Sequence, residues 1–280
     1  MIELLLPLIS FTIAFFSSLA GLSGAFLLIP FQVSVLGLVD PTVNATNFLY
    51  NVIAIPSGVY RYAKERRFLW ILAISMISGV IPGIFVGSLI RTTVLLEAEK
   101  FKIFVGLVLL YLGIRTFYTV LRRDKINEKF KEFGVLKAEL KMHKKGVGLT
   151  EFEFWGEIYK FSPIKVCLVA LLIGIIGGIY GVGGGVLLTP IVVTLFRLPL
   201  YTIAGASLFG TFIASIAGVL NYTALGYPPN LRIGILLGIG GFFGVYNGAR
   251  IQKYVPERII RTILSLLILA LAFRYLSVLV

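Results

Sequence analysis

A glycine-rich stretch occurs twice in the sequence, as GLSGAFLLIP at residues 21–30 and as GVGGGVLLTP at residues 181–190. The two copies share both outer glycines of the tip, two leucines and the final proline. The offset of 160 residues persists downstream, where Ile53, Ala54 and Gly58 align with Ile213, Ala214 and Gly218. With a slip of one residue, Gly79, Gly83 and Gly87 then align with Gly240, Gly244 and Gly248. Duplication of one half explains these matches.

Long apolar segments surround both glycine stretches. Hydrophobic residues make up 58% of the chain and charged residues only 14%, whereas a soluble domain has about 25% charged residues. The mean hydropathy is +0.96, and most apolar segments have the length of a bilayer core. We expect helical segments at 3–20, 23–38, 43–60, 69–90 and 101–121, and again at 164–180, 185–196, 202–222, 231–251 and 259–279. The predicted fold is an all-α polytopic membrane protein with two repeats of about five segments each.

The charged residues divide the chain into three parts. Residues 1–121 form the predicted first transmembrane repeat, residues 122–163 a polar linker and residues 164–280 the second repeat. Within the linker, Lys129–Lys145 is expected to form a solvated helix, and Phe152, Phe154 and Trp155 are expected to dock at the membrane interface. Four other aromatic residues are expected as interface anchors, namely Tyr60, Tyr62, Trp70 and Tyr222.

The distribution of Lys and Arg predicts the topology, because cytoplasmic loops collect basic residues. The loop with Arg61, Lys64, Arg66 and Arg67, the central linker and the loop around residues 250–261 are assigned to the inside. The outer loops then hold Arg91, Lys100 and Lys102, while the loop at 223–230 has no charge. Each half therefore crosses the membrane an odd number of times, which gives inverted repeats, an architecture common in secondary transporters. We expect a multi-pass protein of the cell membrane with a cytoplasmic linker.

The role of the second segment in each half stays open at this point. Residues 185–196 would give about 18 Å of helix, which is short for a bilayer. The first two segments of each half either both span the membrane or form a hairpin within it. Both arrangements preserve the inverted repeat.

The same composition argues against several functions. The basic residues lie beside apolar segments, and no nucleic-acid-binding pattern accompanies them, so no nucleic acid is expected as a partner. The chain has one cysteine, Cys167, and one histidine, His143. We find no catalytic constellation, no metal cluster and no cofactor motif, so an enzyme is not expected.

The two glycine tips are the predicted binding elements. Helices that begin at such tips expose backbone N–H groups and the positive end of the helix dipole, which suits an anion. The alternative is that the glycines only permit tight turns and close packing. The candidate residues of the tips are Gly21, Ser23, Gly24, Gly181, Gly183, Gly184 and Gly185.

Polar side chains at the start of the third segment of each half complete the predicted site. Amides and hydroxyls are costly in hydrocarbon, so they should face the protein interior. The candidates are Asn44, Asn47, Asn51, Ser207 and Thr211, whereas Gln32 is left out of the predicted site. The alternative role of these side chains is hydrogen bonding between helices. Since no charged residue lies near the middle of a predicted span, we expect neutral donors to hold the anion.

The two ladders of glycines spaced by four, at 79–87 and 240–248, receive a different interpretation. Residues four apart lie on one face of a helix, and glycines there let a neighbouring helix approach closely. We therefore expect these ladders to serve packing.

The sequence resembles the TauE/SafE family, also called the sulfite exporter family. The resemblance is carried by Gly181–Gly185, the following Leu187-Leu188-Thr189-Pro190, Ala204–Leu208, and the glycine-rich stretch at 240–248. In the first half Ser23 and Ala25 occupy glycine positions, and Asn47 stands where the second half has Ser207. The resemblance implies transport of sulfur oxyanions, sulfonates or related carboxylates. Two alternatives stay open. The chain could be an anion channel, or a membrane subunit that anchors a cytoplasmic partner through residues 122–163.

The topology leads to a labelling prediction. Single cysteines placed at Val39 and Tyr227 should react with a membrane-impermeant thiol reagent in intact cells, because both positions lie in predicted outer loops. A cysteine at Arg66 should react only after the cells are permeabilised. Labelling of the cysteine at position 66 from outside the cell would contradict the predicted inverted topology.

Overall fold

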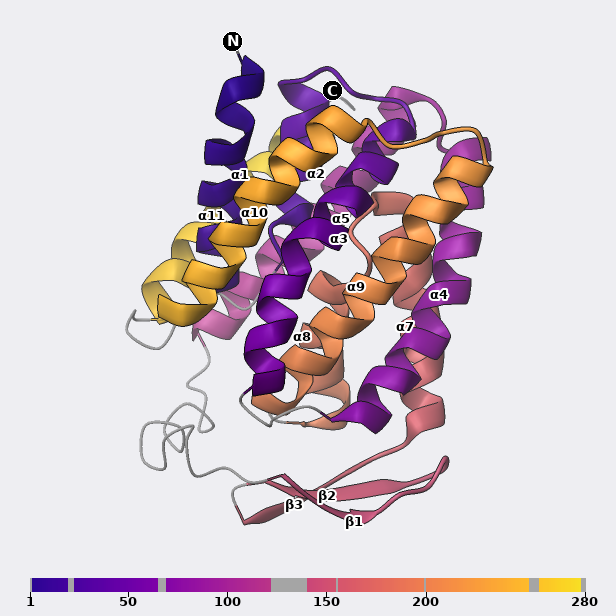
Figure 1. The fold of residues 1–280 in the computed structure, drawn as a ribbon, viewed down its shortest axis with the longest axis vertical. Coiled ribbons are helices and arrows are strands. Elements are labelled where there is room, and N and C mark those ends of the chain that lie inside the picture. Colours follow the sequence, from indigo (N-terminus) through magenta and orange to yellow (C-terminus); the bar gives the residue numbers. More distant parts are fainter. Residues whose placement is uncertain are drawn as a thin grey trace.

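The computed structural model describes residues 2–19, 23–64, 69–121, 140–154, 156–198, 200–251 and 257–277. These residues form ten helices and three strands (Figure 1). The first half contains α1 (Ile2–Leu19), α2 (Ala25–Ser34), α3 (Thr42–Lys64), α4 (Trp70–Thr93) and α5 (Ala98–Leu121). The second half contains α7 (Pro163–Tyr180), α8 (Gly185–Phe196), α9 (Leu200–Ala224), α10 (Leu231–Ile251) and α11 (Glu257–Leu276). All ten predicted helical segments are confirmed.

Helix length separates two kinds of segment. Within the described residues, five helical stretches are long and apolar enough to cross a membrane, namely Trp70–Thr93, Ala98–Tyr118, Pro163–Tyr180, Gly205–Ala224 and Leu231–Ile251. In contrast, α2 has 10 residues and α8 has 12. At 1.5 Å per residue they extend for about 15 and 18 Å, roughly half of a 30 Å hydrocarbon core. Neither short helix can therefore cross a bilayer alone.

Several helices of each half pack against helices of the other half. The fourth helix of each half packs along the first helix of the other half, so that α4 lies on α7 and α10 lies on α1. In the same way α10 packs on α3, α4 packs on α9, and the fifth helices α5 and α11 pack together. In Figure 1, α1 runs from the N-terminal end towards the sheet, whereas α7 starts beside the sheet and runs away from it. An inverted repeat would place its helices in this way, and their orientation in the membrane stays a prediction.

The glycine ladders confirm their predicted role in packing. A Cβ atom at Gly83 of α4 would lie 2.8 Å from the Cα atom of Gly174 in α7. A Cβ atom at Gly244 of α10 would lie 2.8 Å from the Ala14 Cβ atom in α1. Both distances are too short for real atoms, so the backbones of these helix pairs can approach only because the side chain is absent.

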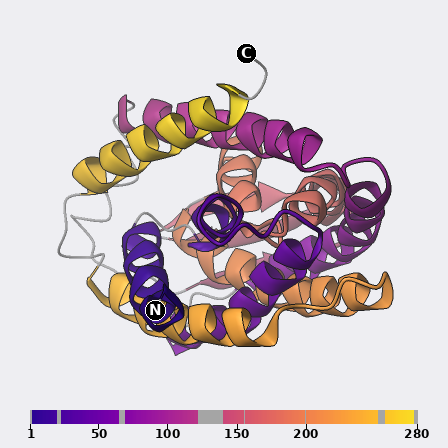
Figure 2. The same ribbon diagram turned by 90° about the horizontal axis from the view of Figure 1, so that it is seen from above.

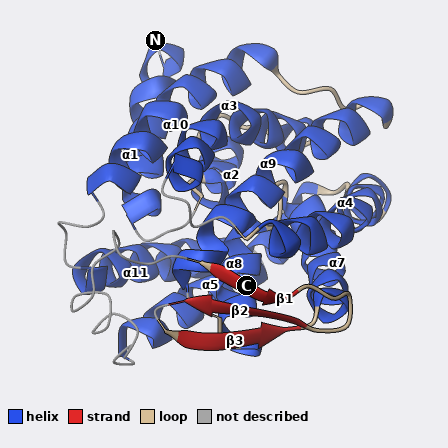
Figure 3. Cartoon of the chain, turned by 60° about the horizontal axis from the view of Figure 1, so that its bottom comes forward, coloured by secondary structure: helices blue, strands red, loops and turns tan. Residues whose placement is uncertain are grey.

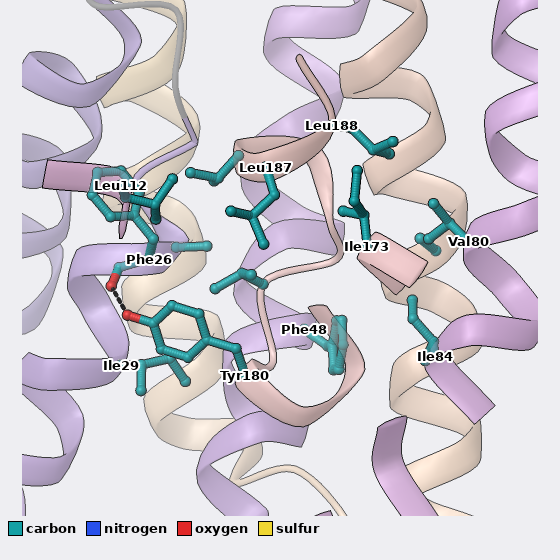
Figure 4. Packing of buried hydrophobic residues seen from close by; sticks show 14 of the residues in the cluster. Phe26, Ile29, Phe48, Val80, Ile84, Leu112, Ile173, Tyr180, Leu187 and Leu188 are labelled. Atoms are coloured by element: carbon teal, nitrogen blue, oxygen red, sulfur yellow. Dashed lines mark hydrogen bonds between the residues drawn. The ribbon is translucent and has the colours of Figure 1, made fainter. Parts of the chain in front are cut away.

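The short helix α2 lies at the centre of the molecule, where Figure 2 shows it end-on, surrounded by the other helices. Its side chains from Ala25 to Pro30 are buried. Figure 4 shows how side chains of α2, α3, α7 and α8 interlock in this core. The outward faces of the longer helices carry exposed apolar side chains, as expected for contact with lipid. Examples are Ile74, Leu107, Leu172, Leu220, Phe243 and Phe273.

A three-stranded antiparallel sheet lies at one end of the helical body (Figure 3). Its strands are β1 (Lys141–Lys144), β2 (Thr150–Phe154) and β3 (Glu157–Phe161). The helix predicted for Lys129–Lys145 is therefore wrong over β1, while residues 129–139 lie outside the described residues. A hydrogen bond of 2.8 Å from the Lys160 ammonium holds the pKa of Glu151 below its usual value.

The burial of several aromatic residues differs from the predicted interface role. Along β2, buried and partly buried residues alternate. Phe152 and Phe154 are fully buried within the chain and do not face the membrane interface. Trp155 lies outside the described residues. Tyr222 is also fully buried, whereas Tyr60 and Trp70 are exposed, as interface anchors must be. Periodic burial in β2 fits a short strand whose inner face covers the helical end.

The packing of α4 on α7 leads to a stability prediction. Gly83→Ala should destabilise the protein by about 1–3 kcal/mol, because the new methyl group overlaps the backbone of α7. Gly210→Ala is the matched control, since a Cβ atom there lies 3.8 Å from its neighbours in α4. That change should leave stability equal or raise it by up to about 1 kcal/mol through helix propensity. Thermal unfolding in detergent measures both, and equal melting temperatures for the two variants would contradict the proposed close approach.

Candidate functional site

The turn between α7 and α8 is built from glycines in left-handed conformations. The φ angles of Gly181, Gly183 and Gly184 are 79°, 69° and 79°, a region that other residues rarely adopt. The Gly181 N–H ends α7 by donating to the Gly177 carbonyl at 2.8 Å, and the Gly184 carbonyl accepts the first bonds of α8. Gly24 has the same place before α2, whereas Gly21 lies outside the described residues.

Asn47 of α3 joins the two glycine tips. Its Nδ2 atom donates to the Ala25 carbonyl at 3.1 Å and to the Gly181 carbonyl at 2.7 Å. One carbonyl belongs to the first turn of α2 and the other to the loop before α8. A single buried amide therefore connects the first turn of α2 with the loop that precedes α8.

The contacts of Asn47 also determine how Gln32 is oriented. Since the Asn47 Nδ2 atom is held by two carbonyls, its Oδ1 atom faces Gln32 and accepts a bond from Gln32 Nε2 at 3.3 Å. The Gln32 Oε1 atom is then buried without a partner among the described residues. It is an acceptor that water or a solute donor can satisfy. Sequence reasoning left Gln32 out, and its pairing with Asn47 was the missing information.

The other two asparagines of α3 bind the end of α7 and the loop that follows it. Asn44 Nδ2 donates to the Ile179 carbonyl at 2.8 Å, and Asn51 Nδ2 lies 3.5 Å from the Val182 carbonyl. Asn51 Oδ1 also accepts a bond of 3.2 Å from the Ser23 hydroxyl, so it reaches the first tip as well. All three asparagines are fully buried. Their amides are hydrogen-bonded between helices in this conformation, as the alternative interpretation expected.

The equivalent helix of the second half, α9, contacts α8 of its own half through hydroxyl groups. The Ser207 hydroxyl accepts a bond from Thr189 at 2.7 Å and lies 3.4 Å from the Gly185 carbonyl. This contact corresponds to that of Asn47 with Ala25, at the offset of 160 residues. A Cβ atom at Gly183 would lie 2.9 Å from Thr211 Cγ2, so α9 closes directly over the glycines.

Taken together, these contacts show where the predicted site residues lie. The structure gathers Ser23, Gly24, the three asparagines, Gly181, Gly183–Gly185, Ser207 and Thr211 into one buried region, with Gly21 outside the described residues. Tyr180, which was not predicted, also belongs to it. Its hydroxyl donates to the Phe26 carbonyl at 2.6 Å and ties α7 to α2, as the dashed line in Figure 4 shows.

Arg91 is the third residue that sequence reasoning missed. It was assigned to an outer loop, but it lies in the last turn of α4 and is fully buried. Its Nε atom donates to Asn44 Oδ1 at 3.1 Å, and its guanidinium lies 3.9 Å from the centre of the Phe101 ring. The signal was available, since Arg91 follows Gly87 by four residues and so continues the packed face of α4.

The described part of the chain contains no group of three or more His, Cys, Asp or Glu side chains that could hold a metal ion. The chemistry of the region therefore consists of amides, hydroxyls, backbone groups and one guanidinium. Such groups bind a solute through hydrogen bonds and charge.

Comparison with known proteins agrees with this architecture. The family model "Sulfite exporter TauE/SafE" matches residues 6–275. The "Probable membrane transporter protein YunE" of Bacillus subtilis (strain 168) is 25% identical over 262 residues, which are 90% of this chain and 89% of YunE. The "Probable membrane transporter protein MamO" of Magnetospirillum gryphiswaldense is 22% identical over 244 residues, 82% of this chain but 38% of MamO. No solved structure matches significantly. The chain therefore belongs to the sulfite exporter TauE/SafE family of integral membrane transporters.

Proposed function

We propose that the chain is a secondary transporter that carries a small anion by alternating access, and that the anion binds where the two glycine tips meet. The observation that carries this proposal is the bridge formed by Asn47 between Ala25 and Gly181. Broken helices that meet at the interface of two repeats are the usual site of substrate binding in secondary transporters.

The charge of the solute is inferred from the groups around the tips. Backbone N–H groups in the first turn of a helix have no partner within that helix, and they form the positive end of its dipole. In α8 these include the N–H groups of Gly185 and Val186, which precede the first helical bond from Leu187 to Gly184. With Arg91 behind Asn44, this region favours a negative charge.

The proposed solute is a sulfur oxyanion or an organosulfonate. This class rests on the family of the chain. The tetrahedral oxygens of such an anion suit several neutral donors converging from different helices, here amides of α3 and hydroxyls of α9.

The contacts also suggest how the site opens. The amides of Asn44, Asn47 and Asn51 bond to carbonyls at the end of α7 and in the following loop, so an entering anion must exchange with these carbonyls. Movement of the α7–α8 loop away from α3 would release the donors. Because the two halves pack against each other in corresponding ways, an equivalent movement of the other half would open the site to the opposite side of the membrane.

The proposed setting is the cell membrane, with the linker at residues 122–163 in the cytoplasm and its basic residues near anionic lipid. In the proposed topology the two repeats are inverted. The loops rich in Lys and Arg support this orientation.

A transport assay tests the proposal. Purified protein in liposomes should take up labelled sulfite or methanesulfonate with saturation, and preloading with unlabelled anion should accelerate uptake by counterflow. Uptake that rises linearly without counterflow would indicate a channel. Removing residues 122–139 from the linker should leave transport intact. If the full-length protein carried no anion, the alternative role as a membrane anchor would gain support.

Two substitutions predict the contribution of the neutral donors. Asn47→Ala and Ser207→Ala should each raise the dissociation constant of the anion by about 10- to 150-fold, because a hydrogen bond to a charged group is worth roughly 1.5–3 kcal/mol. The matched controls are Asn247→Ala and Ser78→Ala, whose side chains donate to carbonyls of their own helices. Binding measured by thermal shift should be unchanged in both controls. Unchanged affinity in both site variants would remove the neutral donors from the mechanism.

A further inference from the structure

Arg91 is a buried cation whose partners are all neutral. Its Nε atom binds Asn44 Oδ1, its Nη1 atom donates to the Leu95 carbonyl at 2.5 Å, and its Nη2 atom donates to the Val39 carbonyl at 2.8 Å. Among the described residues no carboxylate forms an ion pair with it, since the salt bridges of these residues lie elsewhere. Asp40, Tyr222 and Tyr227 act on its charge from longer range.

A buried charge normally has a counter-charge, because hydrogen bonds to neutral groups replace only part of the lost hydration. Carbonyl dipoles and the face of Phe101 provide partial compensation here. Asp40 acts on this arginine only from longer range, and no carboxylate of the described residues forms an ion pair with it, while the other buried polar side chains of these residues are uncharged. An anion bound nearby would supply the missing negative charge.

The contacts of Asn44 connect this charge to the glycine tip. The same amide accepts from Arg91 through Oδ1 and donates to the Ile179 carbonyl through Nδ2. A Cβ atom at Gly181 would lie 3.1 Å from Asn44 Nδ2, so the amide lies directly against the tip. A cation at the oxygen of an amide polarises it and strengthens the donation from its nitrogen.

We propose that Arg91, together with Asn44, determines the specificity of the transporter for negatively charged solutes, and that the bound anion serves as the counter-charge of the guanidinium. This inference rests on the proposed function. In the proposed site the neutral donors hold the solute in position. The positive charge of Arg91 behind them favours solutes with a negative charge.

A purely structural role for Arg91 makes a different prediction. The side chain also ties together the loop before α3, through Val39, and the loop after α4, through Leu95. If it only held these loops, its loss would weaken the binding of charged and uncharged solutes equally. The ratio of the two affinities therefore distinguishes the roles.

The experiment compares methanesulfonate with methanesulfonamide, an uncharged molecule of nearly the same shape, binding to the full-length protein in detergent. The wild-type protein should prefer methanesulfonate by at least about 10-fold. Arg91→Gln should reduce this preference to about twofold or less, because it weakens methanesulfonate binding much more than methanesulfonamide binding, while Arg91→Lys should restore most of the preference. The matched control is Arg232→Gln, which removes an arginine whose side chain is 75% exposed and should not alter the preference.

A second variant keeps the test decisive if Arg91→Gln does not fold. Asn44→Asp leaves Arg91 in place and puts a carboxylate oxygen where Asn44 Oδ1 lies, 3.1 Å from the Nε atom. The guanidinium then has a built-in counter-charge, so the preference for methanesulfonate over methanesulfonamide should be lost. The variant also loses the Nδ2 donor to the Ile179 carbonyl, so its melting temperature should fall moderately. A retained preference in this variant would overturn the inference.

The remaining outcomes separate the inference from the proposed function. Equal loss of both probes in Arg91→Gln, with rescue of neither by Arg91→Lys, would overturn the inference and leave sulfonate transport standing. Binding of acetate but not of methanesulfonate, with the same dependence on Arg91, would support the inference and overturn the proposed sulfur substrate. A wild-type protein that binds no anion in preference to a neutral analogue would overturn both.

Discussion

Backbone polar groups inside a membrane protein must find partners within the protein, and the rest of this structure depends on how that constraint is met at two interrupted helices. Each of α2 and α8 starts deep in the molecule, where the preceding chain is not helical. Hydrocarbon offers no hydrogen bonds, so the carbonyls exposed by the interruption would be costly if left free. The asparagines of α3 satisfy the carbonyls at residues 179, 181 and 182. A polar cluster at this depth is thus a structural necessity before it is a binding site.

The surrounding helices hold the short helices at their middles as well as at their starts. The Tyr275 hydroxyl of α11 donates to the Pro30 carbonyl of α2 at 3.1 Å. At the offset of 160 residues, Arg115 of α5 donates to the Pro190 carbonyl of α8. Each short helix is therefore bound near its proline by the fifth helix of the other half. The glycine ladders bring α4 and α7, and α10 and α1, close enough to enclose the short helices on both sides.

Hydropathy and repeat analysis were sufficient for the helices, because a segment that faces both lipid and protein must be apolar along most of its length. The segments at 185–196 and 231–251 agree with α8 and α10 in both boundaries. The sheet was missed because its strands are only four or five residues long and lie in a polar region without an apolar run, although TEFEF in β2 has the alternation of a half-buried strand. The burial of Arg91 was missed because counting charges in loops does not show which of them fold back into the protein.

The partners of the asparagines could not be predicted, since they lie 131 to 135 residues away in the sequence and are backbone atoms without a sequence signature. Yet these partners make the two halves unequal. Asn44 and Asn47 of α3 correspond to Ala204 and Ser207 of α9, and the hydroxyl of Thr211 bonds to the Ser207 carbonyl of its own helix. A movement that separates the α7–α8 loop from α3 breaks three bonds between the halves, each worth roughly 1 kcal/mol in a membrane protein. Three such bonds would favour the closed arrangement by a factor of about 150. In the proposed alternating-access cycle the two states would therefore differ in energy, and an anion that replaces the carbonyls as acceptor would reduce that difference.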